Sequence, residues 1–251
     1  MTLRAALLLL LVGLLPGCVT TGKVNPMDTQ KGRNEARDAY VQLGLGYLMQ
    51  GDTERAKVPL KSALDLDSSS QDANAALALV FQAEREPKLA EEYFRKSLSS
   101  GENARIRNNY GSFLFEQQRY PEAYEMFQKA ASDPLYPERS RVFENLGMAA
   151  QQLNRPDEAQ GWLEKAIAMN GRQPRALLEL AEIAYDRKQF VPSRDYFQRF
   201  SQLSEQNARS LLLGIRLAKV FEDKNTAASY GLQLKRLYPG TPEYQQYLSE
   251  H

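Results

Sequence analysis

A small residue recurs through the chain at an almost constant spacing, and this spacing limits the folds that are open to it. The recurring positions are separated by 34, 33, 36, 34 and 34 residues. They are Ala56, Ala90, Ala123, Ala159, Ser193 and Ala227. Self-similarity at a fixed period of roughly 20 to 50 residues indicates an array of units, each too small to bury its apolar face alone. The spacing therefore predicts six copies of one supersecondary unit.

Each unit is expected to hold two antiparallel helices, A and B, that pack closely. Close packing needs small side chains on helix A, and the eighth position of the first five units carries Gly44, Ala78, Gly111, Gly147 and Ala181. The period resembles that of the tetratricopeptide repeat, a helix-turn-helix unit. This resemblance implies an all-α fold, a right-handed α-solenoid built over residues 36–251. We expect the six repeats at about 37–70, 71–103, 104–137, 140–173, 174–207 and 208–241.

Turn and cap residues agree with this division. Asp52 and Asn225 are the expected N-caps of helix B in the first and last units, because their side chains can accept from free backbone N–H groups. A short C-terminal capping helix is predicted from about 242 to 249. Its apolar side chains Tyr244, Tyr247 and Leu248 are expected to face inward and cover the open end of the array.

The N-terminus carries a leucine-rich run from Leu3 to Leu15 that stops at a Pro-Gly-Cys sequence. The run is too short for a membrane span, which needs roughly 20 apolar residues. One basic residue followed by a short apolar stretch is typical of a secretory signal, so residues 1–17 are predicted to be a signal peptide. An ordinary cleaved signal with an incidental cysteine is one interpretation. The alternative, which we favour, is that Leu15-Pro16-Gly17-Cys18 resembles the bacterial lipoprotein box.

That resemblance implies that Cys18 becomes an acylated N-terminus. Residues 18–35 would then form the lipidated N-terminus and a flexible tether, because they are polar and include Gly22, Pro26 and Gly32. Val19 stands where an aspartate would favour retention in the inner membrane. By resemblance to lipoprotein sorting, the expected location is the outer membrane, facing the periplasm.

The charge balance and the rare reactive residues exclude several functions. Removal of the signal peptide takes away Arg4, one of the 32 basic residues, and leaves 31 basic and 31 acidic residues. Nucleic-acid binding needs an excess of basic residues on one surface, so it is not expected. Because the single histidine is the terminal His251 and the single cysteine is Cys18, neither a Ser-His or Cys-His arrangement nor a histidine–cysteine metal site is expected. We therefore predict no enzyme, no metal, no small-molecule substrate, and no cofactor apart from the lipid on Cys18.

Helix A of each repeat is expected to line a concave face, and its first unit is unusually apolar. The groove predicted to bind a partner consists of Val41, Leu45, Leu48, Met49 and Leu79. A contiguous exposed apolar patch usually marks an interaction site. The alternative is that residues 34–39, or the tether, fold back and cover it.

The second position of the later repeats carries a ladder of arginines at Arg105, Arg141, Arg175 and Arg209. Such a ladder could hold an acidic peptide through charge-assisted hydrogen bonds. Pairing with nearby carboxylates of this chain is the other interpretation, and it is the one we favour. The candidate carboxylates are Glu144, Glu179 and Glu182.

Three segments resemble the pilotin lipoproteins of type IV pili: "EARDAYVQLGLGYLMQGDTERAKVPLKSALDLD", "LYPERSRVFENLG" and "ARSLLLGIRLAKVFED". The resemblance implies an outer-membrane lipoprotein that helps subunits of the secretin PilQ to reach the outer membrane and form multimers. It would thereby support pilus assembly and twitching motility. The competing interpretations are a lipidated repeat scaffold of an outer-membrane barrel-assembly complex and an activator of a cell-wall enzyme.

Overall fold

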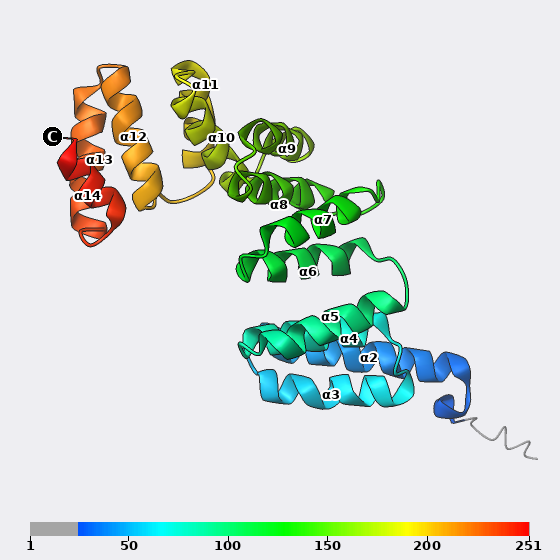
Figure 1. Ribbon diagram of the computed structural model, residues 1–251. Helices are drawn as coiled ribbons and strands as arrows, with labels where there is room; N and C mark the ends of the chain where they lie inside the picture. Colours follow the sequence, from blue (N-terminus) through cyan, green and yellow to red (C-terminus); the bar gives the residue numbers. More distant parts are fainter. Residues whose placement is uncertain (1–24, 251) are drawn as a thin grey trace, which may run out of the picture. The chain divides into compact units, whose positions relative to one another are not determined.

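The computed structural model describes residues 25–250, and within that range every regular element is helical. A short 3₁₀-helix, η1, precedes thirteen α-helices, α2 to α14 (Figure 1). The predicted all-α architecture is confirmed. The chain divides into two compact units, of which the first ends at Ser68 and the second begins at Ser69.

The first unit contains η1 (Pro26–Asp28), α2 (Gln30–Met49) and α3 (Thr53–Leu66). Helices α2 and α3 pack against each other as the first A and B pair (Figure 1). A Cβ atom added to Gly44 would lie 2.5 Å from Cγ of Leu60, and Leu60 is fully buried. Gly44 therefore allows the close approach that the repeat pattern predicted.

The segment expected to be a tether is partly ordered. Helix α2 already begins at Gln30, and the hydroxyl of Thr29 caps it by accepting from the backbone N–H of Gly32 at 2.9 Å. The carbonyl oxygen of Pro26 would lie 1.8 Å from a Cβ on Gly32, so η1 packs directly on the first turn of α2. The cap and this glycine explain why the helix starts seven residues before the predicted repeat boundary at 37.

The second unit contains five further A and B pairs and a final single helix. The pairs are α4 (Gln71–Ala83) with α5 (Pro87–Ser99), α6 (Ala104–Glu116) with α7 (Tyr120–Ala131), α8 (Arg139–Gln152) with α9 (Pro156–Met169), α10 (Pro174–Asp186) with α11 (Phe190–Ser201), and α12 (Ala208–Val220) with α13 (Lys224–Leu237). Within this unit each helix B also packs against the helix A that follows it. This pairing is the stacking expected of a solenoid.

Small residues set the packing within the pairs of the second unit as well. A Cβ on Gly111 would lie 2.6 Å from the ring of Phe127, and one on Gly147 would lie 2.5 Å from Cγ of Leu163. Phe127 and Leu163 are almost completely buried. In these two pairs, as in the first unit, a glycine of helix A therefore faces a large buried residue of helix B.

The final helix, α14 (Pro242–Ser249), closes the array as predicted. Tyr244 and Tyr247 pack against the last core cluster, which lies between α12 and α13. A Cβ on Gly231 would lie 2.6 Å from the hydroxyl oxygen of Tyr247, so this glycine makes room for the capping tyrosine. The prediction that Leu248 faces inward is wrong: the residue is 49% exposed, because successive residues of a helix point about 100° apart.

The turns between helices A and B share a left-handed residue. It is Gly51 in the first pair, with φ of 79°, and Asn154 and Lys188 in the fourth and fifth, with φ of 55° and 60°. The residue that follows it is the N-cap of helix B. Asp52 caps α3 as predicted, accepting from Arg55 N–H at 3.0 Å, whereas the predicted cap Asn225 lies inside α13, whose cap is Asp223.

Candidate functional site

Helix α2 carries most of the predicted partner-binding groove on one flank. Leu45, Leu48 and Met49 follow Gly44 at spacings that place them about 100°, 40° and 140° around the helix from the side facing α3. Leu45 and Leu48 are half-buried, while Met49 is 89% exposed at the last position of the helix. These three side chains leave apolar surface open on a rigid element.

Val41 does not share this exposure. Its side chain is only 3% exposed. It lies about 60° from Gly44 in the middle of α2, whereas Leu48, at a similar angle, lies in the last turn of the helix. A buried side chain cannot be part of a surface that receives another protein, so the prediction that Val41 lines the groove is wrong.

Leu79 belongs to the second unit and lies on α4. It is half-buried and packs against the core cluster that includes Ala75 and Ala78. Leu79 therefore serves mainly to cover the core of its own helix pair.

The arginine ladder is largely committed to carboxylates of this chain. Arg209 is the clearest case, because it donates to both carboxylate oxygens of Glu179 at 2.6 and 2.7 Å and also pairs with Glu182. Glu179 is only 2% exposed. Two parallel N–H donors on a buried carboxylate form a strong and geometrically specific interaction, so Arg209 supports the interpretation we favoured.

The other three arginines are held more weakly. Arg105 pairs with Asp72 of the preceding repeat, and both side chains are about half exposed. Arg141 lies 3.8 Å from Glu138, a distance at which an exposed pair contributes little. Arg175 is exposed, and its charge acts on Glu144. The ladder is thus held unevenly: Arg209 and Arg105 have close carboxylate partners, whereas Arg141 and Arg175 are exposed.

Two carboxyl groups beside the ladder have perturbed acidities. Burial raises the pKa of Glu144 above its usual value, although Arg175 and the backbone N–H of Ala176, at 3.3 Å, oppose the rise. Burial likewise raises the pKa of Glu182, although Arg209 opposes it. For Arg209, burial on its own lowers the pKa, but the bonds to the two carboxylates raise it overall. Ion-pair networks produce such shifts without any catalytic role.

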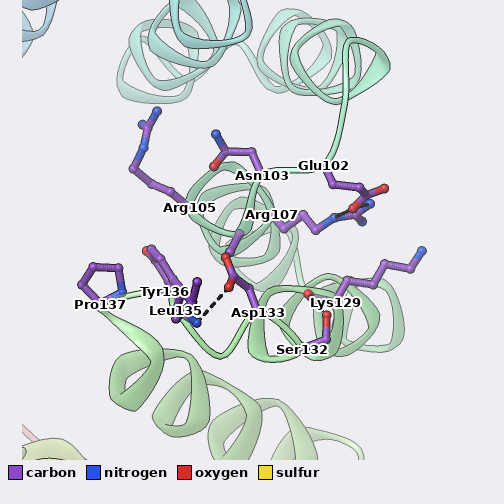
Figure 2. A pocket seen from close by; sticks show the side chains of 11 residues that line it. Glu102, Asn103, Arg105, Arg107, Lys129, Ser132, Asp133, Leu135, Tyr136 and Pro137 are labelled. Atoms are coloured by element: carbon purple, nitrogen blue, oxygen red, sulfur yellow. Dashed lines mark hydrogen bonds and ion pairs between the residues drawn. The ribbon is translucent and has the colours of Figure 1, made fainter.

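Sequence reasoning missed a pocket of about 490 Å³ between α6, the end of α7 and the loop to α8 (Figure 2). Glu102 and Arg107 pair with each other on one side, and Tyr136 and Pro137 line the opposite side. The carboxylate of Asp133 accepts from the backbone N–H of Leu135 at 2.9 Å, and Leu135 is 87% exposed. The signal for this loop was the interval of 36 residues in place of 34.

A smaller cavity of about 250 Å³ lies between α10, α12 and α14. Glu182, Arg209 and Arg216 line it, together with Glu243 of the capping helix. Arg216 donates to Glu250 at 2.5 Å, so both arginines already have carboxylate partners here.

The described residues contain no group of three or more side chains that could hold a metal ion. None of the helices in that part of the chain is long and apolar enough to cross a membrane. Cys18, the predicted lipidation site, and His251 lie outside the described residues. The absence of enzymatic activity stays a prediction.

Helix pairs that pack through small residues recurring about every 34 residues are the mark of a tetratricopeptide-repeat protein. Family models of the tetratricopeptide repeat match residues 102–170 and 145–208. Over all 251 residues of both chains, this chain is 61% identical to the type IV pilus assembly protein PilF of Pseudomonas aeruginosa. It belongs to the same family of tetratricopeptide-repeat proteins.

Solved structures agree with this assignment. A structure of Pseudomonas aeruginosa PilF covers 88% of this chain and 100% of its own, with a TM-score of 0.86 and 61% identity. A crystal structure of PilW, described as a widely conserved type IV pilus biogenesis factor, covers 86% of this chain and 99% of its own, with a TM-score of 0.74 and 29% identity.

Proposed function

We propose that this chain is a lipid-anchored outer-membrane protein that binds a secretin subunit and promotes secretin multimerisation. Membership of the PilF family supports a role in type IV pilus biogenesis. A lipid on Cys18 would anchor the chain in the outer membrane. The apolar flank of α2 would bind the partner. The partner would be PilQ, the secretin of the pilus.

The exposure of apolar side chains on α2 is the main support for the proposed binding site. Met49 is 89% exposed beside the half-buried Leu45 and Leu48. Leucine and methionine side chains suit an amphipathic or extended apolar segment, because methionine adapts its shape to different partners. Anchoring this surface at the membrane raises its effective concentration toward subunits that arrive there.

A photocrosslinker at position 49 tests the binding site in cells. We expect it to capture the secretin, whereas a crosslinker at Leu135, which is 87% exposed on the second unit, should not. Leu48→Asp should reduce secretin multimers while the far-ultraviolet spectrum keeps its helical signal. Normal secretin multimers in a folded Leu48→Asp, Met49→Asp double variant would show that this flank is not the site.

Anchoring is tested separately with Cys18→Ser. The variant should lose its lipid, which mass spectrometry detects, and should leave the outer-membrane fraction. A chain that stays in that fraction without lipid would contradict the proposed anchor.

A deletion strain separates the proposal from the barrel-assembly and cell-wall alternatives. Loss of pili with normal growth is the expected result. Loss of viability would favour a barrel-assembly scaffold, and altered cell-wall synthesis would favour an activator of a cell-wall enzyme.

A further inference from the structure

A second apolar stripe runs along the opposite flank of α2 from the proposed secretin-binding surface. Tyr40, Leu43 and Tyr47 lie about 40°, 100° and 60° from Gly44, in the rotational sense opposite to that of Leu45 and Met49. Tyr40 is 38% exposed and Leu43 is 49% exposed. Within the first unit α2 packs against α3 and η1, and neither covers these two side chains.

The chemistry of this stripe fits the boundary between lipid and water. Tyrosine has an apolar ring and a polar hydroxyl, and it is enriched where one end of a side chain is wet and the other is not. The guanidinium of Arg55 lies 5.8 Å from the ring centre of Tyr47 and its side chain is 71% exposed. A guanidinium beside such a ring can reach phosphate groups while its stem covers apolar surface.

The path of the chain places this stripe near the proposed anchor. Pro26 packs on Gly32, which lies about 120° from Gly44 on the same side of α2 as Leu43. The chain therefore enters the first unit on the flank that carries the stripe. Six residues separate Cys18 from Asn25, and a segment of that length spans at most about 25 Å when fully extended.

We propose that the stripe formed by Tyr40, Leu43 and Tyr47 rests against the phospholipid surface in which Cys18 is anchored. The inference rests on the proposed lipidation of Cys18. Acidic and basic residues nearly balance over residues 25–68, so the contact depends on apolar burial and on the short connection rather than on anionic lipid. With this flank on the membrane, Met49 on the other flank stays available to a protein partner.

Tryptophan fluorescence on vesicles tests the contact directly. The mature full-length chain is coupled through Cys18 to a maleimide lipid in phosphatidylcholine vesicles, with or without brominated acyl chains that quench tryptophan. Leu43→Trp is the test variant, and Met49→Trp on the same helix is the matched control. The parent chain, whose single tryptophan is Trp162, supplies the background.

We expect the brominated lipid to remove about half or more of the added fluorescence of Leu43→Trp and to leave that of Met49→Trp unchanged. No quenching at position 43, or equal quenching at both positions, overturns the inference. Shielding of position 43 by a second copy, seen as crosslinked dimers without quenching, overturns it as well. Because the maleimide lipid replaces natural acylation, a failure here leaves the proposed function intact, whereas an unlipidated Cys18 in cells contradicts the anchor itself.

Discussion

Removing Arg209 gives the sharpest test of how the later repeats are held together. In Arg209→Met the carboxylate of Glu179, which is 2% exposed, loses two hydrogen bonds of 2.6 and 2.7 Å and its counter-charge. Breaking a buried ion pair on one side costs about 3 to 5 kcal/mol. Since the Arg209 side chain is 44% exposed, water can enter the vacated space, and we expect a loss of about 2 to 3 kcal/mol.

The matched control is Arg141→Met. Arg141 occupies the same repeat position, but its side chain is 67% exposed and lies 3.8 Å from its partner. The change there should cost at most about 0.5 kcal/mol. The free energy of opening can be measured by amide hydrogen exchange in α10 and α12, because a solenoid can unfold one part at a time.

A double variant separates the lost pair from the buried charge. Arg209→Met with Glu179→Leu removes the buried pair and leaves Glu182, whose side chain is 24% exposed, without its partner. Most of the loss in Arg209→Met should be recovered, because apolar replacements of a buried pair are often neutral. Equal losses for Arg209→Met and Arg141→Met, or no recovery in the double variant, would refute the reasoning.

Three further changes are predicted from single contacts. Lys188→Gly should stabilise the chain by about 1 kcal/mol, measured by urea unfolding, because Lys188 has a φ of 60° that glycine adopts freely. Gly147→Leu should lower the melting temperature by overpacking against Leu163, whereas Gly161→Ala, with no atom within 4 Å of the new Cβ, should raise it slightly. Burial raises the folded-state pKa of Glu144, so the folded chain binds more protons than the unfolded chain at weakly acidic pH. The free energy of unfolding therefore falls as pH rises through that range. Glu144→Gln should reduce this pH dependence, measured by urea unfolding at a series of pH values, and should increase stability at pH 7.

The repeat, the helix pairs and the capping helix could be predicted because they depend on spacing. Gly44 and Gly147 follow from the period alone, since two backbones that approach closely exclude a side chain. The division of the chain after Ser68 could not be predicted in this way, because the period continues without change across it.

Individual surfaces were harder to predict than elements. The spacing placed Val41, Leu45 and Leu48 on one flank of α2. Burial also depends on how far a residue lies from the end of the helix, which the repeat pattern does not give. The pairing of Arg209 with Glu179 and Glu182 could be predicted, because the repeat places their helices side by side. The early start of α2 was missed because a cap at Thr29 and a single glycine contact decided it.

The seat that Gly231 provides for Tyr247 has a consequence for engineering. A repeat added after α13 would have to displace that tyrosine. The first helix of the added repeat would then pack against the space beside Gly231 that the tyrosine ring now fills. Designers who wish to lengthen this scaffold should therefore insert new modules upstream of α12 and keep the native terminus as a ready-made end piece.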